Sequence, residues 1–329
     1  MKKMIKKSIK NLISKYEHYR HYKSHRDKAY QILKDVESGK GKTDPKSIKL
    51  SNDYAANVLG WSGYAPWLYV YSAIAGCFKE GWIPDNYYSR VVIPATNYGK
   101  ISALNSFTSK IFRSTLFPEL VYYVNGLFYL PNYKIISIEE VKKIIFKNSD
   151  KVVFKLDNSS KGRGVFILEK SNFDNSRLQT LGNGVFQTYI KQHQLFKELM
   201  PWSVATIRMT TVMEKSGNST LRACYLRIGR NDDTHIKAES SLRVPVDCLT
   251  GELSEKGFLS NWTTVNKHPD TNIPFINKVI PNFSNSVTAI LELHKLFPLV
   301  HCIGWDVTID ENNILNIMEW NGGHNGIKF

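Results

Sequence analysis

The most informative pattern in the sequence runs from residue 303 to residue 323: Ile303-Gly-Trp-Asp-Val-Thr-Ile-Asp-Glu-Asn-Asn-Ile-Leu-Asn-Ile-Met-Glu-Trp-Asn-Gly-Gly323. Two apolar runs flank a cluster of Asp, Glu and Asn, and this pattern predicts a β-hairpin. Asn tolerates the left-handed backbone that a tight turn requires. A turn centred between Asn312 and Asn313 would set Asp306 directly opposite Glu319.

This hairpin would gather oxygen ligands on one of its faces. Side chains alternate along a strand, so Glu319 and Asn321 share a face and Trp320 points away. Two adjacent carboxylates repel, and Asp306 and Glu319 therefore need a neutralising partner. Hard oxygen ligands of this kind suit Mg²⁺. The alternative is a solvated hairpin whose surface acids are unrelated.

The composition indicates an anionic partner. Lys and Arg number 44 against 29 Asp and Glu, a formal net charge of +15 in 329 residues. Phosphate, a uronic-acid polymer, nucleic acid or a membrane surface would match this charge. The sequence shows no signature of a nucleic-acid-binding module, so we expect no nucleic-acid partner. Four scattered cysteines without a CxxC pair favour a reducing, cytoplasmic location and argue against zinc.

The first 34 residues carry eleven Lys or Arg against two acids, which is +9. Their apolar residues fall at helical spacing, which predicts a basic amphipathic helix (Ile5, Ile9, Leu12, Ile13 and Tyr16). No continuous apolar region follows the lysines, so the segment is not a signal peptide. It would either attach to the anionic inner membrane surface or pack on its own domain. Residues 38–51 suggest a linker, and the apolar run 65–78 suggests a buried helix too short to span a membrane.

A glycine-rich loop lies between two predicted strands in the middle of the chain. The strands are 152–156 and 165–168, and the loop is Asp157-Asn-Ser-Ser-Lys-Gly-Arg-Gly164. Glycines let a backbone approach phosphate closely, and Lys155 would place an ammonium at the end of the first strand. The loop is not a Walker A sequence, and an ordinary hairpin loop is the alternative.

Two arginines interrupt later apolar strands. Arg208 lies within Thr206–Val212, and Arg227 lies within Leu221–Ile228. A buried arginine needs an anionic partner. That partner is either an internal acid or a phosphate or carboxylate ligand, which a guanidinium binds through two parallel hydrogen bonds.

These parts, in this order, resemble the ATP-grasp superfamily over roughly residues 80–329. The nearest resemblance is to the sugar-transfer-associated ATP-grasp proteins of polysaccharide gene clusters, through Gln192-His193, Ser203-Val-Ala-Thr-Ile-Arg208, His268-Pro-Asp-Thr271 and Ile303-Gly-Trp-Asp306. The resemblance implies an α+β fold in which two α+β subdomains clamp ATP, here with a helical basic N-terminal extension. We expect a basic segment and linker at 1–50, an N-terminal α/β domain at 51–147 and the ATP-grasp domain at 148–329.

The resemblance also implies roles for particular residues. Nucleotide would be bound by Lys110, Lys155, Ser159, Ser160, Gly162, Gly164, Gln187, Thr188, Tyr189 and Ile190. Backbone groups of Thr188 and Ile190 would contact the adenine edge. Mg²⁺, commonly two ions, would be held by Asp306, Glu319 and Asn321. The catalytic residues would be Arg208 and Arg227, close to the reacting phosphate and the acceptor.

Three positions depart from the family pattern. Thr188 replaces an acid often found beside the adenine, so the ribose contact is open between His193 and Glu198. Ser109 stands where an Asp usually precedes Lys110. The segment 239–244 lacks the expected glycines, which leaves the acceptor site undefined.

The implied reaction joins a sugar carboxylate to an amine. An ATP-grasp ligase transfers the γ-phosphoryl group of ATP to a carboxylate, and an amine then displaces phosphate to form an amide. The acceptor would be an anionic sugar or glycan of a capsule or O-antigen, and the amine an amino acid or amino alcohol. A kinase that phosphorylates a sugar hydroxyl is the first alternative. A non-catalytic basic protein that binds membrane or glycan is the second.

Overall fold

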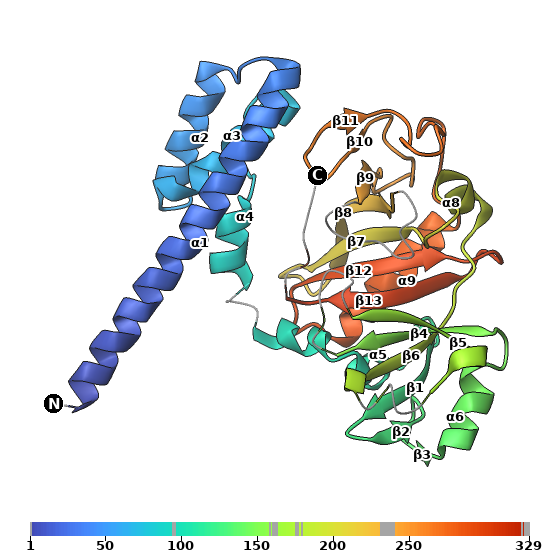
Figure 1. The fold of residues 1–329 in the computed structure, drawn as a ribbon. Coiled ribbons are helices and arrows are strands. Elements are labelled where there is room, and N and C mark those ends of the chain that lie inside the picture. The colour runs from blue at the N-terminus through green and yellow to red at the C-terminus, as the bar shows by residue number, and fades with distance from the viewer. Residues whose placement is uncertain are drawn as a thin grey trace. The chain divides into compact units, whose positions relative to one another are not determined.

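A computed structural model of the chain describes residues 2–93, 97–157, 159, 164–174, 178, 180–230, 241–323 and 325, with side chains for all of these except 2–11, 14 and 97. The chain divides into two compact units. Unit 1 comprises residues 1–95 and 261–263, and unit 2 comprises residues 96–260 and 264–329. Unit 1 is helical, while unit 2 contains two β-sheets (Figure 1). The expected α+β class is confirmed, and the domain limits after residues 50 and 147 stay a prediction.

Unit 1 consists of helices and short helical turns. They are α1 (Lys2–Lys40), α2 (Pro45–Asn57), η1 (Ser62–Tyr64), α3 (Ala65–Ala75), α4 (Asp85–Tyr87) and η2 (Tyr88–Val92). Helix α3 is the predicted buried apolar helix, and it ends at Gly76, which adopts the left-handed conformation of a helix C-cap.

The linker predicted at 38–51 is wrong, because all of it except residues 41–44 is helical. Helix α2 begins at Pro45, directly after Asp44. The Asp44 carboxylate accepts hydrogen bonds from the N–H groups of Lys46 at 3.2 Å and Ser47 at 2.9 Å. An Asp that caps a helix with Pro in its first turn is a helix-start signal. The Lys and Ser content of the segment suggested a linker and hid this signal.

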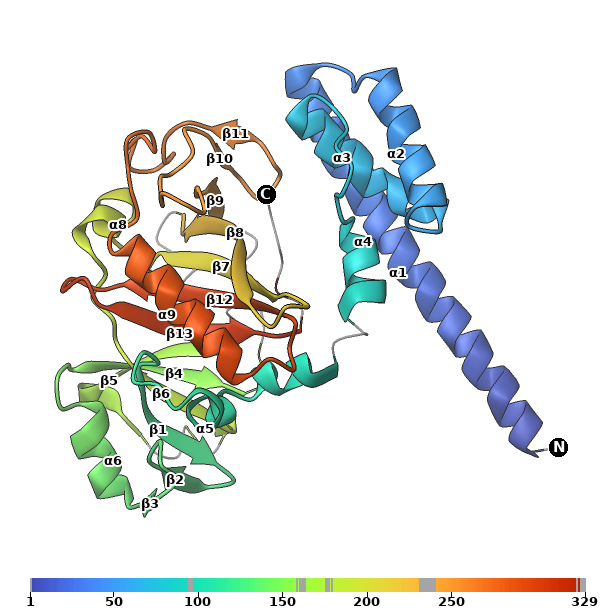
Figure 2. The same ribbon diagram turned by 180° about the vertical axis from the view of Figure 1, so that it is seen from behind.

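The two halves of α1 have different surroundings. The C-terminal half packs on α3 through a core cluster that contains Ala29, Ile32, Leu33, Val36, Trp67 and Val70. The N-terminal half extends beyond the other helices of unit 1 (Figures 1 and 2). Its apolar side chains are exposed: Leu12 by 67%, Ile13 by 53%, Tyr16 by 62% and Tyr19 by 57%. Among the described residues, no helix combines the length and apolarity needed to cross a membrane.

One sheet of unit 2 has six strands in the order β3-β2-β1-β6-β4-β5. The strands are β1 (Glu119–Val124), β2 (Leu127–Tyr129), β3 (Ile135–Ile136), β4 (Lys151–Leu156), β5 (Val165–Glu169) and β6 (Gly184–Thr188). The turn between β1 and β2 has positive φ at Asn125 and Gly126, as a two-residue hairpin turn requires. Helix α6 (Ile138–Ile145) begins with a capping box at Ser137 and packs on β1 and β6.

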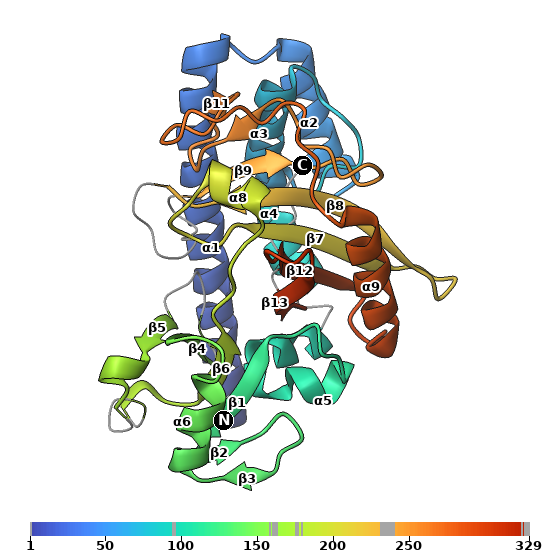
Figure 3. The same ribbon diagram turned by 90° about the vertical axis from the view of Figure 1, so that its right-hand side faces the viewer.

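The other sheet has seven strands in the order β11-β10-β9-β8-β7-β12-β13. They are β7 (Thr206–Met213), β8 (Ser219–Ile228), β9 (Leu242–Pro245), β10 (Gly257–Phe258), β11 (Thr264–Val265), β12 (Cys302–Ile309) and β13 (Leu315–Asn321). Helix α9 (Phe283–Leu296) lies along one face of the sheet (Figures 2 and 3). That face is apolar and includes Ile207, Leu226, Val244 and Trp305, all fully buried. The side chains that alternate with these lie on the opposite, polar face.

The terminal hairpin β12–β13 contains a β-bulge. Ile309 pairs with Leu315 and Val307 with Ile317, whereas Asp306 pairs with Glu319. Met318 is therefore an extra residue on β13. The predicted pairing of Asp306 with Glu319 is confirmed, but the predicted turn centre is wrong by half a residue. Without the bulge, the Asp306 partner would be Met318, and Glu319 would lie on the apolar face.

The end of β13 is closely packed against η4 (Asn97–Ala103). A side chain on Gly99 would overlap the carbonyl of Gly322, so the two backbones can touch only because Gly99 has none. The N–H of Gly322 donates to Ser102 Oγ at 3.0 Å. The remaining short helices of unit 2 are η5 (Asn105–Phe107), α5 (Thr108–Phe112), η6 (Lys170–Asn172) and α8 (Gln194–Leu199).

Candidate active site

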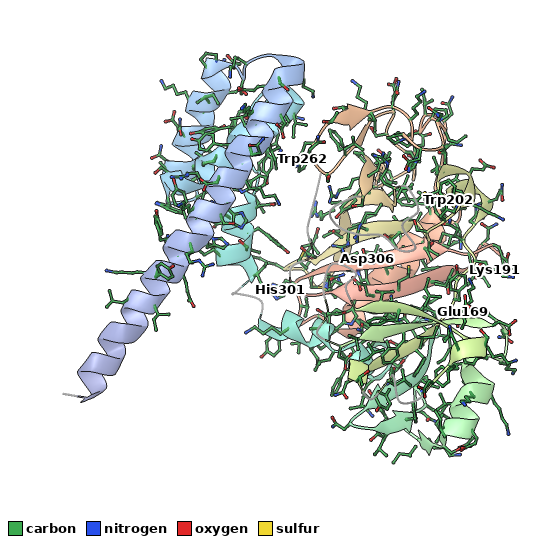
Figure 4. All side chains as sticks on the ribbon, in the orientation of Figure 1. Glu169, Lys191, Trp202, Trp262, His301 and Asp306 are labelled. Atoms are coloured by element: carbon green, nitrogen blue, oxygen red, sulfur yellow. The ribbon has the colours of Figure 1, made fainter. Side chains whose placement is uncertain are left out.

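The predicted ligand set meets on the polar face of the terminal hairpin. Asp306 lies near the middle of β12, within unit 2 (Figure 4), and its carboxyl group is within hydrogen-bonding reach of Glu319. Asn321 Nδ2 donates to Glu319 Oε1 at 3.2 Å and to the carbonyl of Gly304 at 3.4 Å. Trp320 points to the apolar face and is 2% exposed. The structure therefore brings together the three residues that the sequence predicts.

Two arginines from neighbouring strands bind Asp306. Arg208 on β7 donates through Nε to Oδ1 at 2.6 Å and through Nη2 to Oδ2 at 2.9 Å. Arg227 on β8 donates through Nη1 to Oδ2 at 3.3 Å. A further Arg208 group, Nη1, donates to the backbone carbonyl of Asn325. The internal-acid alternative is thus correct for Arg208, which forms a bidentate ion pair with Asp306.

The two carboxyl groups differ in their electrostatics. Burial acts to raise the pKa of Asp306, but the charges of Arg208 and Arg227 outweigh burial and lower it below its usual value. Burial and the neighbouring Asp306 charge raise the pKa of Glu319, and Lys155 only partly offsets them. Asp306 is therefore the ionised partner. The positive charge near Glu319 therefore offsets only part of what burial and Asp306 do to its pKa.

Lys155 approaches this pair from the six-stranded sheet. It is buried at the end of β4, and its Nζ donates to the carbonyl of Met318 at 3.0 Å. Gln187 Nε2 on β6 donates to the same carbonyl at 3.2 Å. Met318 is the bulge residue, outside the regular β12–β13 ladder, so its carbonyl is available to both side chains. Burial lowers the pKa of Lys155, and the charges of Glu319, Asp306 and Glu119 act against that effect.

Glu119, which the sequence analysis missed, is a buried acid in the same region. It pairs with Gln187 across β1 and β6 and accepts hydrogen bonds from the hydroxyls of Ser109 and, at 2.5 Å, Tyr122. Burial raises the pKa of Glu119 to about 6. The family pattern has an Asp at the position of Ser109, and here Ser109 instead donates to the acid Glu119 on β1. The available signal was a glutamate at the start of an otherwise apolar strand.

The other predicted nucleotide residues are only partly assembled. Lys110 lies 5.8 Å from the ring centroid of Tyr133. The N–H of Thr188 donates to the Pro118 carbonyl at 2.8 Å, so this N–H is already engaged. Ile190 is buried and Tyr189 is partly exposed. At the glycine-rich loop, a side chain on Gly164 would overlap Ser159. Ser160 and Gly162 lie outside the described residues.

The donor set fits Mg²⁺. It offers two carboxylates and, because Asn321 donates through its nitrogen, an amide oxygen. Asp306 keeps lone pairs beyond those that its arginines engage, and a cation would supply the positive charge that Glu319 lacks. The described residues contain no cluster of three or more His, Cys, Asp or Glu that could hold a metal by themselves. Two carboxylates and an amide leave coordination positions for phosphate oxygens and water.

A surface cavity of about 470 Å³ lies elsewhere in unit 2. Its lining contains none of the residues around Asp306, and it consists of Lys256, Thr264, Val265, Asn266, Lys267, Pro269 and Asn272. We place the candidate site at Asp306 because buried, mutually bonded charges gather there.

The sequence model of the sugar-transfer associated ATP-grasp family matches residues 104–329. The chain belongs to this family. The match covers both sheets of unit 2 and every residue of the candidate site, and it confirms the ATP-grasp resemblance. No curated protein matches the chain in sequence.

Solved structures similar to this chain include three enzymes. An N5-carboxyaminoimidazole ribonucleotide synthetase in its ADP complex shares 12% identity at a TM-score of 0.40, over 67% of this chain and 44% of that one. The biotin carboxylase domain of the Hydrogenobacter thermophilus 2-oxoglutarate carboxylase, in complex with MgADP, ADP and bicarbonate, shares 13% identity at a TM-score of 0.39, over 68% of this chain and 40% of that one. D-alanine–D-alanine ligase from Bacillus anthracis shares 15% identity at a TM-score of 0.36, over 68% of this chain and 57% of that one. The chain thus spans about half the length of these proteins.

Proposed function

We propose that the protein is an ATP-dependent carboxylate–amine ligase of surface polysaccharide biosynthesis. The observation that carries this proposal is the buried Asp306, held by two arginines beside Glu319, with Lys155 reaching the same hairpin. Such a group of charges suits a triphosphate and Mg²⁺ better than it suits a purely structural role. Unpaired buried charge is costly unless a ligand completes the network.

The site residues would act mainly by positioning and charge neutralisation. Lys155 would contact the α and β phosphates, while Gln187 and the backbone of Thr188 and Ile190 line the adenine pocket. Asp306, Glu319 and Asn321 would hold Mg²⁺, which neutralises phosphate charge when bound. Arg227 would stabilise negative charge on the transferring phosphoryl group. Arg208 would fix the Asp306 carboxylate through its two short hydrogen bonds.

The reaction would proceed in two steps. A carboxylate oxygen of the sugar acid attacks the γ-phosphorus, and the bond from phosphorus to the β-γ bridging oxygen breaks. ADP is released, and the sugar acid becomes an acyl phosphate. The amine nitrogen then attacks the acyl carbon and loses a proton, and phosphate leaves as the amide forms. The net charge of +15 supports an anionic acceptor such as a uronic acid.

ADP release by the purified full-length protein tests this function. We expect release to require ATP, Mg²⁺, a uronic-acid glycan and an amine together, with an amide product of the matching mass. Release without any amine, together with a stable phosphorylated sugar, would favour the kinase alternative. If no nucleotide binds in the presence of Mg²⁺, both enzyme proposals fail and a basic binding protein remains.

We also propose that the N-terminal half of α1 attaches the enzyme to an anionic membrane surface. Leu12, Tyr16 and Tyr19 are spaced along one face of the helix and are exposed, and basic side chains such as Lys15 and Arg20 lie beside them. An apolar face with basic neighbours is the composition of an interfacial helix. The C-terminal half of α1 instead packs on α3. We therefore assign membrane attachment to the N-terminal half only, and packing on the chain's own domain to the C-terminal half.

Replacing both Leu12 and Tyr16 by Ser should weaken binding to anionic liposomes at least about ten-fold. Burying one large apolar side chain is worth roughly 1.5–3 kcal/mol, and both are exposed in the folded protein. Co-sedimentation with anionic and zwitterionic vesicles measures this change. Binding of the wild type to anionic vesicles should weaken as salt is added, because salt screens the attraction between charges. Leu249→Ser is the control, because Leu249 is 91% exposed in unit 2. Unchanged binding of the double variant, or equal binding to both vesicles, would remove this proposal.

A further inference from the structure

A β-bulge at the start of β1 turns Glu119 onto the face of the six-stranded sheet that carries Lys155 and Gln187. Glu119 pairs with Gln187, whereas Val121 pairs with Phe186, so one extra residue lies between the two pairs on β1. Val121 and Phe186 belong to the apolar core that α6 covers. Side chains alternate along a strand, so without the bulge Glu119 would point into that core.

The carboxyl group of Glu119 is bonded through one oxygen only. Its Oε2 accepts hydrogen bonds from the hydroxyls of Ser109 and, at 2.5 Å, Tyr122. Its Oε1 has no hydrogen-bond partner among the described residues. A carboxylate can accept several hydrogen bonds, and an oxygen that lies deep in a protein seldom goes without a donor. The residue keeps part of its surface exposed, so a ligand can reach Oε1 and supply that donor.

Glu119 also lies beside the segment proposed to bind the base. The N–H of Thr188 donates at 2.8 Å to the carbonyl of Pro118, the residue that precedes Glu119. The side chain of Gln187, directly opposite Glu119, already donates to the carbonyl of Met318. Glu119 Oε1 is therefore an unused acceptor next to the proposed adenine pocket.

We propose that Glu119 Oε1 accepts a hydrogen bond from the exocyclic amino group of adenine and so selects ATP over nucleotides with a 6-oxo base. This inference rests on the proposed function and assigns its base specificity. Adenine carries an amino donor at the position where guanine carries a carbonyl acceptor. A 6-oxo base would place its carbonyl oxygen against Oε1, and two acceptors without a proton between them repel.

Calorimetric titration with ADP and inosine diphosphate (IDP) tests this assignment. IDP has the 6-oxo group in place of the amino group, and neither nucleotide has a γ-phosphoryl group to transfer. The full-length protein is titrated with Mg²⁺ at pH 8, where Glu119 is ionised because its pKa is about 6. Wild type should bind ADP about 10- to 100-fold more tightly than IDP, the range expected for one hydrogen bond to a charged group.

Glu119→Gln should lose most of this preference for ADP. An amide has the size of the carboxylate and can still accept from Ser109 and Tyr122, but it carries both a donor and an acceptor and can rotate to suit either base. Glu119→Asp keeps the charge and withdraws the oxygen by one methylene group, so it should weaken ADP binding more than IDP binding. A purely structural role would instead weaken both nucleotides equally and leave their ratio unchanged.

Glu169→Gln is the matched control. Glu169 is a glutamate of the same sheet, on β5, but it is exposed and pairs with Lys151 at 3.3 Å. The affinities for ADP and IDP should both remain those of the wild type.

Two results would overturn the assignment and leave the proposed function intact. They are equal affinities of the wild type for ADP and IDP, which needs no variant to measure, and a Glu119→Gln protein that keeps the wild-type preference. Wild-type protein that binds neither nucleotide in the presence of Mg²⁺ would instead overturn the proposed function, and the assignment with it.

Discussion

Arg208→Ala is expected to lower the free energy of unfolding of unit 2 by about 3–5 kcal/mol. The change removes both hydrogen bonds to Asp306 and leaves a buried carboxylate without its main counter-charge. Breaking a buried ion pair on one side costs this much, because the remaining charge is still buried. The partner of Arg208 is thus present before any ligand binds, and the catalytic role expected of Arg208 stays a prediction. In differential scanning calorimetry the transition of unit 2 should fall by about 6–20 °C.

Arg222→Ala provides a matched control for this prediction. Its ion pair with Glu214 has the same 2.6 Å length, but the Arg222 side chain is 60% exposed. Exposed pairs contribute about 0–1 kcal/mol, so the transition should move by at most a few degrees. The double variant Arg208→Met with Asp306→Leu should recover much of the lost stability, because apolar groups can replace a buried pair. Equal effects of Arg208→Ala and Arg222→Ala would contradict the argument.

Glu319→Gln is expected to reduce turnover by about 10²–10³ without loss of stability. Glutamine has the same shape and can still accept the hydrogen bond from Asn321, but it cannot carry the negative charge proposed to bind Mg²⁺. Loss of one electrostatic contact in an active site costs about 2.7–4 kcal/mol in the transition state. Stability should be kept or slightly raised, because burial and Asp306 already disfavour the charged form of Glu319.

Two measurements separate this effect from misfolding. Mg²⁺ with an ATP analogue should raise the melting temperature of wild type but should have little effect on Glu319→Gln. Glu311→Gln is the control on the same hairpin, since Glu311 lies in the exposed turn with Lys191 3.8 Å away. Wild-type turnover in Glu319→Gln would exclude this residue from the metal site, whereas a large loss of melting temperature would show a structural role.

Strand alternation was enough to predict that Glu319 and Asn321 share a face, because a strand has a two-residue period. Their meeting with Asp306 depends on the register of the hairpin. The predicted turn centre was wrong, and the pairing survived because the bulge at Met318 compensates by one residue. The segment Ile314–Met318 gives no local signal for a bulge, which arises from the pairing of β13 with β12.

Other features depend on contacts between distant segments. The bidentate pairing of Arg208 with Asp306 needs the register of β7 and β12, which a single strand pattern does not contain. Glu119 becomes important only because β1 lies beside β6. The start of α2, by contrast, is a local feature that Asp44 and Pro45 signal. The prediction of a linker there was wrong because it followed the composition of the segment and overlooked this helix cap.

The contact of Gly322 with η4 has a consequence for folding during synthesis. The Gly322 N–H and the Ser102 hydroxyl that it binds are 220 residues apart in the chain. Strand β13, with Glu319 and Asn321, is made long after the segment on which it rests. Strand β7 is made well before its partner β12, so its edge stays unpaired until the β12–β13 hairpin emerges from the ribosome, and exposed edges of this kind invite aggregation. We therefore expect translation stalled before residue 315 to yield chains that need chaperone binding to remain soluble.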